Sequence, residues 1–257
     1  MDQLAFYQYV LIGCVFVWSG FVRSGLGFGG AVLALPFLLL IVNDPLVFLP
    51  LIAVHLLFFS SLIMWQSHHA QRQNTTGPSI DWGFLKRAMT IMIVPKLAGV
   101  IGLLTLPAQW MSAIIFVIVF GYALGYLINR PIRNQSKTVD TILLSAGAYI
   151  SGTSLTGAPL IIPVFANHVS KHQLRDTLFV LWWILTAIKL ISFVLVGVDL
   201  QLIHHLWLLP CAAIGHVLGQ RFHQRILAAE TPLFYRILGG GLIIVSAAGL
   251  WQVWWSS

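Results

Sequence analysis

Long apolar runs separated by short polar breaks dominate the chain. A helix needs about 20 apolar residues to cross the hydrocarbon core of a bilayer. The runs that approach this length are residues 5–23, 46–66, 84–104, 110–128, 177–197, 203–220 and 236–254. Shorter apolar pieces broken by glycine and proline lie at 30–42, 139–151 and 157–168. Because lipid cannot pair backbone polar groups, we expect these short pieces to be buried in protein or to line a cavity.

Composition makes a membrane location the only class that fits. The 257 residues are 58% hydrophobic and 8% charged, whereas soluble domains carry about 25% charged residues. So few charges cannot cover the surface of a soluble protein, and two cysteines cannot form a disulfide scaffold. We therefore predict an all-α, polytopic integral membrane protein. Its longest polar stretch, residues 66–81 with the Gly77–Pro78 breaker, is typical of a loop.

The basic residues predict how the chain is oriented in the bilayer. Loops that would share one side hold eleven of them, and the opposite side, with both termini, holds none. This asymmetry predicts that both termini lie outside. It also accounts for the net charge of +7 without nucleic acid as a partner. The eleven residues are Arg72, Lys86, Arg87, Arg130, Arg133, Lys137, Lys171, Arg175, Arg221, Arg225 and Arg236.

One motif occurs twice. Residues 24–36 read SGLGFGGAVLALP and residues 151–163 read SGTSLTGAPLIIP, and they share six residues without a gap. Each half of the chain holds an odd number of segments, so a repeat would enter the membrane upside down. We predict a first inverted repeat over 1–128 and a second over 139–257, within one membrane domain. Chance similarity between two glycine-rich turns is the alternative.

Each repeated turn offers anion-binding chemistry. A helix that begins near Gly30 or Gly157 presents unpaired N–H groups and the positive end of its dipole. Thr156 is expected to cap the second helix, and Pro159 suits its first turn. Two opposed turns would form an anion site near the midplane. Alternatively, the glycines only allow helices to pack closely.

Ionisable residues favour an anion over a cation. The acidic residues all lie in loops or at segment edges, while Arg23, Lys96 and Lys189 lie within or beside the spans. An intramembrane cation indicates a functional site, with snorkelling as the alternative. We favour Arg23 and Lys189 over Lys96. The predicted substrate-binding residues are Arg23, Ser24, Gly25, Gly27, Gly29, Gly30, Ser151, Gly152, Thr153, Ser154, Thr156, Gly157 and Lys189.

His55 and His216 lie in apolar segments and are candidates for a proton relay, because imidazole ionises near neutral pH. Packing is the alternative role for each. The sequence has no zinc-protease spacing, Walker A loop or G-x-S-x-G elbow. We therefore expect no catalytic residues, no metal site and no cofactor.

The paired turns resemble those of the TauE/SafE sulfite-exporter family of membrane permeases. The resemblance implies transport of sulfur-containing or related organic anions across the bacterial inner (plasma) membrane. Thr153, Ser154 and Thr156 stand where that family tends to cluster glycines. The hypothesis is a permease that moves a small anion, such as a sulfur oxyanion or organosulfonate, by alternating access. An anion channel and a membrane scaffold that binds partner proteins are the alternatives. Besides the anion, the expected partner is the lipid bilayer.

Overall fold

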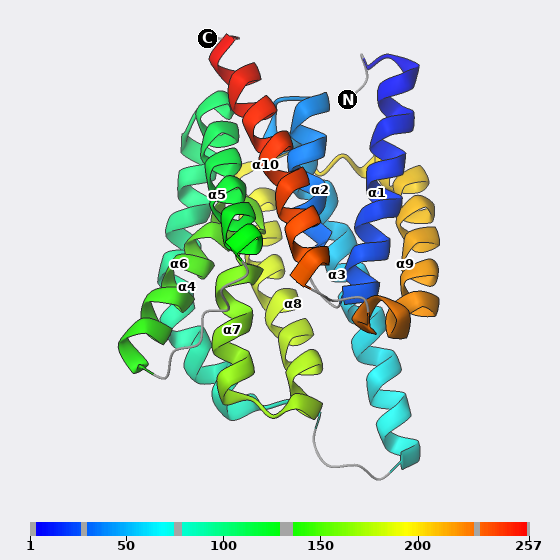
Figure 1. The fold of residues 1–257 in the computed structure, drawn as a ribbon, viewed down its shortest axis with the longest axis vertical. Coiled ribbons are helices and arrows are strands. Elements are labelled where there is room, and N and C mark those ends of the chain that lie inside the picture. The colour runs from blue at the N-terminus through cyan, green and yellow to red at the C-terminus, as the bar shows by residue number, and fades with distance from the viewer. Residues whose placement is uncertain (1–3, 27–29, 75–78, 129–135, 229–231, 256–257) are drawn as a thin grey trace. The chain divides into compact units, whose positions relative to one another are not determined.

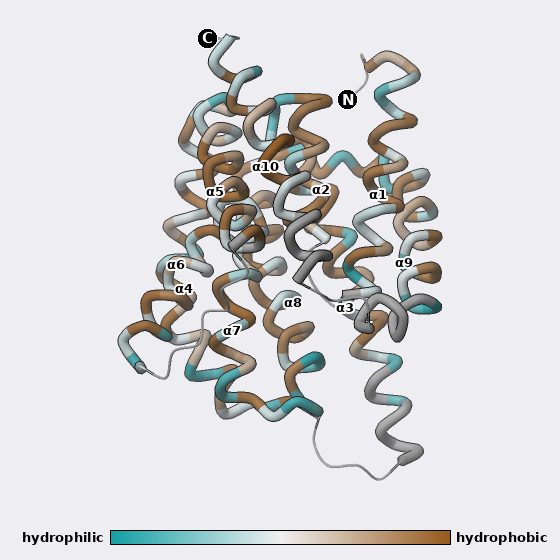
Figure 2. The backbone as a smooth tube through the Cα atoms, in the orientation of Figure 1, coloured by the Kyte–Doolittle hydropathy of each residue, from teal (hydrophilic) through white to brown (hydrophobic). Residues whose placement is uncertain are grey.

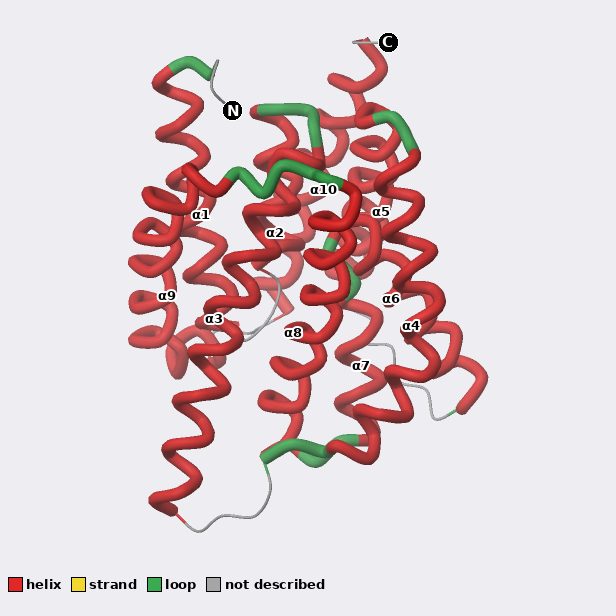
Figure 3. The backbone as a smooth tube through the Cα atoms, turned by 180° about the vertical axis from the view of Figure 1, so that it is seen from behind, coloured by secondary structure: helices red, strands yellow, loops and turns green. Residues whose placement is uncertain are grey.

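The computed structural model describes residues 4–26, 30–74, 79–128, 136–228 and 232–255, and within them it is helical without a strand (Figure 1, Figure 3). The predicted all-α polytopic architecture is confirmed. The helices are α1 (Phe6–Leu26), α2 (Gly30–Ile41), α3 (Pro45–Asn74), α4 (Trp82–Thr105), α5 (Ala108–Ile128), α6 (Lys137–Ser154), α7 (Ala158–His168), α8 (Lys171–Val196), η1 (Leu202–His204), α9 (His205–Ala228) and α10 (Pro232–Trp255).

Helix length and hydropathy agree with a multi-pass membrane protein. Within the described residues, six helices are long and apolar enough to cross a bilayer, while α2 and α7 are shorter apolar helices. Figure 2 shows hydrophobic residues along the helices and hydrophilic residues around the connection from α7 to α8. Six of the seven long apolar runs in the sequence correspond to these long helices, and two of the three short pieces correspond to α2 and α7.

One predicted boundary is wrong. The polar stretch 66–81 was expected to be a loop, but α3 continues through it to Asn74. Residues 67–74 contain neither glycine nor proline. A helix pairs its own backbone in water as well as in lipid, so polarity alone does not end it.

The chain folds into two compact units that each combine helices from both sequence halves. Unit 1 comprises Met1–Leu51, Thr105–Pro131 and Asp199–Ser257, and unit 2 comprises Ile52–Leu104 and Ile132–Val198. The boundary between the units passes through α3. The predicted division into repeats over 1–128 and 139–257 concerns internal similarity rather than compactness, and it stays a prediction.

In unit 1, α1 packs along α9, and α10 packs against α5 and α2. Glycine allows the α1–α9 approach, because a Cβ atom at Gly215 would collide with the Val17 carbonyl and one at Gly20 with the Ala212 carbonyl. Small residues at such crossings let helix backbones approach closely in membranes. The start of α1 and the end of α10 lie at the same end of this unit (Figure 1).

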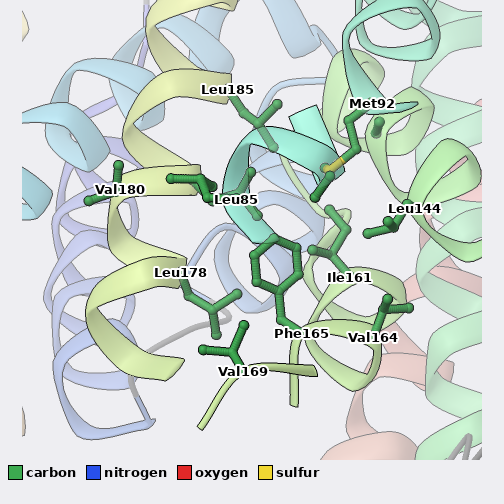
Figure 4. Close-up of a cluster of buried hydrophobic side chains, with 13 residues drawn as sticks. Leu85, Met92, Leu144, Ile161, Val164, Phe165, Val169, Leu178, Val180 and Leu185 are labelled. Atoms are coloured by element: carbon green, nitrogen blue, oxygen red, sulfur yellow. The ribbon is translucent and has the colours of Figure 1, made fainter. Parts of the chain in front are cut away.

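In unit 2, side chains from α4, α6, α7 and α8 form one apolar cluster (Figure 4). Phe165 and Ile161 of α7, both fully buried, lie among Leu85 and Met92 of α4 and Leu144 of α6. Glycine again permits close approach, because a Cβ atom at Gly99 would meet the Tyr149 carbonyl of α6. The cluster therefore fixes α7 against the longer helices around it.

Both short helices fold back along the helix that precedes them. A Cβ atom at Gly30, the first residue of α2, would lie 3.0 Å from the Ser19 carbonyl oxygen and 3.1 Å from Arg23 Cβ, both on α1. A Cβ atom at Gly157, just before α7, would collide with the Gly147 carbonyl of α6. The short pieces are thus packed within protein, as the sequence predicts. Each forms a helical hairpin with its neighbour in the same unit.

Candidate functional site

The second repeated turn is a sharp break between α6 and α7. α6 ends at Ser154, and Leu155 adopts a left-handed conformation with φ 59° while its N–H donates to the Ser151 carbonyl. Such a φ is uncommon for a residue other than glycine and costs free energy. Gly157 then precedes α7, with Pro159 in the first turn as predicted. The break interrupts the helical hydrogen bonding at the last carbonyl groups of α6, of which Ser151 O still accepts from the Leu155 N–H.

Two lysines from other helices bind these carbonyl groups. Lys96 of α4 donates from Nζ to the Ser151 carbonyl oxygen at 2.9 Å and to Ser151 Oγ at 3.0 Å. Lys189 of α8 donates from Nζ to the Thr153 carbonyl oxygen at 3.1 Å and lies over the Phe193 ring. Both lysine side chains are fully buried. The C-terminus of α6 therefore gathers two cations in the interior of unit 2.

Neither buried lysine has an acidic partner. A helix C-terminus carries about half a negative charge, whereas two lysines in their protonated form would bring two positive charges to it. Among the described residues, neither lysine contacts a carboxylate. The protonated lysines would thus leave a surplus of positive charge at this position, which an anion can balance.

Hydrogen-bond donors also remain at this position. An ammonium group has three N–H donors. Lys96 uses two of them and Lys189 uses one on described residues. Ser151 Oγ accepts from Lys96, so its own hydrogen is available. An anion placed here would find donors from α4, α6 and α8.

The other hydroxyl groups of the turn are used internally. Thr153 and Ser154 both donate to the Ile150 carbonyl at 3.0 Å. Ser154 Oγ and Thr156 Oγ1 lie 2.6 Å apart, and Ser154 has already used its hydrogen, so Thr156 donates. The prediction that Thr156 caps α7 is wrong, because Gly157 is the N-cap residue and no side chain caps that helix. Thr156 forms a short hydrogen bond to Ser154, two residues away, instead of capping α7.

The first repeated turn carries a different basic partner. Ser24 Oγ lies 2.5 Å from Nδ1 of His216 on α9. Arg23 is buried beside it in the last turn of α1, and Gly25 is buried as well. Ser19 Oγ donates to the Gly30 carbonyl and ties α1 to α2. Gly27 and Gly29, which were also predicted to contact substrate, lie outside the described residues.

The structure brings some predicted residues together and adds one. Ser151, Thr153 and Lys189 meet in unit 2, and Ser24 meets His216 in unit 1. His55 is buried on α3 in unit 2. Lys96 was placed below Lys189 in the sequence analysis, yet it makes more contacts with the second turn. The sequence feature that could have identified Lys96 is its position near the middle of an apolar segment.

Metal chemistry has no support in the part of the chain that the structure describes, where no group of three or more His, Cys, Asp or Glu side chains could hold an ion. The expectation that the chain has no metal site still rests on the sequence alone.

Comparison with known proteins gives one match. The family model described as sulfite exporter TauE/SafE matches residues 11–249. Searches of curated proteins and of solved structures found no match. The match spans both repeated turns and all the helices that carry them.

Proposed function

This chain belongs to the TauE/SafE sulfite exporter family of membrane transporters, and we propose that it moves a small anion, a sulfur oxyanion or an organosulfonate, across the membrane. The buried pair Lys96 and Lys189 at the C-terminus of α6 carries the proposal. A charge in the membrane interior is costly and usually serves a pathway. An anion would offset the surplus positive charge and fill the unused N–H donors.

A transporter must bind its substrate and release it again, and the hydrogen bonds of Lys96 and Lys189 are compatible with such a cycle. The side-chain amino groups of both lysines donate to backbone carbonyls, which are neutral acceptors. An arriving anion competes with those carbonyls through stronger, charge-assisted hydrogen bonds. It must also leave again, so moderate affinity is useful. We propose alternating access as the mechanism, with Ser151 as a further donor to the substrate.

The recurring helix contacts support the proposed inverted repeats. In unit 1 a glycine face of α9, with Gly215 and Gly219, lies on the last turns of α1 before the break. In unit 2 Gly99 of α4 lies on the last turns of α6 before its break. A repeat whose halves exchange helices would produce this recurrence.

The test is uptake of a labelled sulfonate into proteoliposomes that contain the purified chain. Lys189→Gln keeps a polar side chain that is one atom shorter but removes its charge, and we expect uptake at low substrate concentration to fall at least tenfold. A charge-assisted hydrogen bond is worth about 1.5–3 kcal/mol, or about tenfold to a hundredfold. Lys96→Gln should have a similar effect.

Lys171→Gln is the matched control, because Lys171 is an exposed lysine on the same helix. Thermal unfolding of each variant checks that the protein still folds. Full uptake by both buried-lysine variants would remove the lysines from the substrate site. Uptake that never saturates with substrate concentration would instead favour an anion channel.

A further inference from the structure

Unit 2 contains a cavity whose lining includes neither of the buried lysines. Its volume is about 300 Å³, and residues of α4, α6 and α7 line it. Arg87 and Lys137 contribute exposed cationic side chains to this lining. Neither residue belongs to the repeated turns, and the proposed transport site does not use them.

Apart from Phe84, which stacks on His168, the lining changes from polar to apolar in the same spatial direction on each helix. On α4 the cation Arg87 is followed one turn later by Ile91, and on α6 Lys137 is followed two turns later by Leu144. On α7 the order is reversed along the chain, because Val164 comes one turn before His168. At 1.5 Å per residue the gradient extends over about 6–10 Å. The cavity thus has one charged end and one hydrocarbon end.

The charged end lies at the depth expected for lipid headgroups. α4 begins with Trp82, which is exposed, and Arg87 follows little more than one turn later. Exposed tryptophans mark the interface of a bilayer. Arg87 would therefore lie just below the interface, with Ile91 in the hydrocarbon.

The charges at this end sum to a positive value. Asp140 is the one acidic residue in the lining, and its Oδ2 lies 2.7 Å from His168 Nε2. The His168 ring stacks on Phe84 at a centroid distance of 4.9 Å, which fixes its position. With Asp140 engaged by His168, the charges of Arg87 and Lys137 remain for a ligand.

From this juxtaposition of two exposed cations with an apolar cleft, we propose that the cavity binds an anionic phospholipid. The phosphate group contacts Arg87 and Lys137, and an acyl chain lies along Ile91, Leu144 and Val164. A basic pocket between membrane helices is a typical site for such headgroups. A small hydrophilic anion would gain nothing from the apolar end, so the amphipathic lining favours a lipid.

The experiment measures thermal stabilisation of the full chain in detergent as lipid is added. A ligand that binds the folded state raises its unfolding temperature. Phosphatidylglycerol is compared with phosphatidylcholine of the same acyl chains, with inorganic phosphate and with glycerophosphoglycerol, the headgroup without acyl chains. We expect stabilisation by phosphatidylglycerol at far lower concentration than by the other three.

The double variant Arg87→Gln/Lys137→Gln should weaken phosphatidylglycerol binding about 25-fold, because each basic side chain contributes about fivefold. The control Lys86→Gln/Lys171→Gln removes two exposed charges outside the cavity lining and should bind as the wild type does. If the double variant fails to fold, each single variant should show its fivefold loss.

Equal stabilisation by the two phospholipids would overturn the proposal. An equal loss of phosphatidylglycerol binding in the control variant would also overturn it, because it would indicate that the lipid is attracted to basic surface residues in general. Stabilisation by phosphate or glycerophosphoglycerol at the same concentration as by phosphatidylglycerol would indicate that the cavity binds a free anion rather than a lipid, and would overturn the proposal. None of these results depends on transport activity, so the proposed function is tested separately.

Discussion

The two repeated turns share a serine at the same position but pair it with different bases. Ser24 meets the imidazole of His216 in unit 1, and Ser151 meets the ammonium group of Lys96 in unit 2. In each unit the base comes from a helix that also supplies a closely packed glycine, Gly215 on α9 or Gly99 on α4. The helix contact is alike in the two units, whereas the chemistry at the serine differs.

The helix contact through glycine tolerates little change, whereas the base beside the serine can vary. Backbone contacts through glycine fix how a helix lies against the turn. The base beside the serine then decides which group can carry a charge at the turn, the ammonium group of a lysine or the imidazole of a histidine. The predictions below test first the shared contact and then the difference.

The largest effect should come from alanine at the shared glycines. Gly215→Ala would drive a Cβ atom into the Val17 carbonyl, and Gly99→Ala into the Tyr149 carbonyl. Because backbone cannot move aside as a side chain can, each substitution should lower the free energy of unfolding by about 1–3 kcal/mol or more. Denaturant titration of the purified variants in detergent measures this loss.

Each substitution has a matched control. A Cβ atom at Gly102 on α4 would lie 3.7 Å from the Tyr149 hydroxyl, and one at Gly13 on α1 would lie 3.5 Å from the Trp207 ring. Both distances are ordinary contacts, so Gly102→Ala and Gly13→Ala should leave stability unchanged or slightly raised. Losses of equal size in the controls would mean that these helices tolerate no alanine, and the argument from close approach would fail.

Hydrophobicity predicted the helices well because the bilayer imposes one rule on all of them. Every apolar segment expected from the sequence is a helix, including the short pieces before and after Leu155. The extension of α3 to Asn74 was missed because a polar sequence that leaves the bilayer can remain helical. Family membership was also predictable, since the repeated motif and its spacing are local features of the sequence.

The contacts of the turns were less predictable because they depend on which helices meet. Sequence placed Lys96 mid-segment but could not show that it reaches Ser151, 55 residues later. Thr156 has the type and position of a cap, yet its hydroxyl binds Ser154 instead. Hydroxyl groups near a helix end have several partners within reach. The choice among them depends on the backbone geometry of the break, which the motif does not encode.

The second effect in size concerns the two serines. Ser151→Ala removes one of two hydrogen bonds to a buried ammonium group, and Ser24→Ala removes a bond to an imidazole. Hydrogen bonds to charged groups are worth about 1.5–3 kcal/mol, and neutral ones about 0.5–1.5 kcal/mol. With Lys96 protonated, Ser151→Ala should therefore lower the free energy of unfolding by more than Ser24→Ala does, by about 1 kcal/mol.

Ser145→Ala on α6 is the control, because Ser145 is partly exposed, and it should have little effect. The comparison is made in one detergent at pH 8, where an imidazole of ordinary acidity is mostly neutral. Equal losses at Ser24 and Ser151 would indicate that the two bases are in the same charge state. The contrast drawn between the turns would then be wrong.

The smallest effect should be the pH dependence of substrate binding at the first turn. When His216 is neutral and accepts at Nδ1, Ser24 donates its only hydrogen to the ring. A protonated imidazole donates from both nitrogens, which releases the Ser24 hydrogen for an anion. A hydrogen bond of about 1 kcal/mol corresponds to about fivefold in affinity. If His216 takes up a proton between pH 8 and pH 6, the apparent affinity for a sulfonate should rise by up to about fivefold over that range.

A sulfonate is the right probe because its own charge does not change over this pH range, whereas that of sulfite does. His216→Gln should remove the pH dependence. If His55 is part of the same relay, His55→Gln should also flatten the profile, and if it is a packing residue the profile should stay as in the wild type. A profile unchanged by His216→Gln would show that the proton acts elsewhere, and the histidine at the first turn would then be equivalent in function to any neutral partner of Ser24.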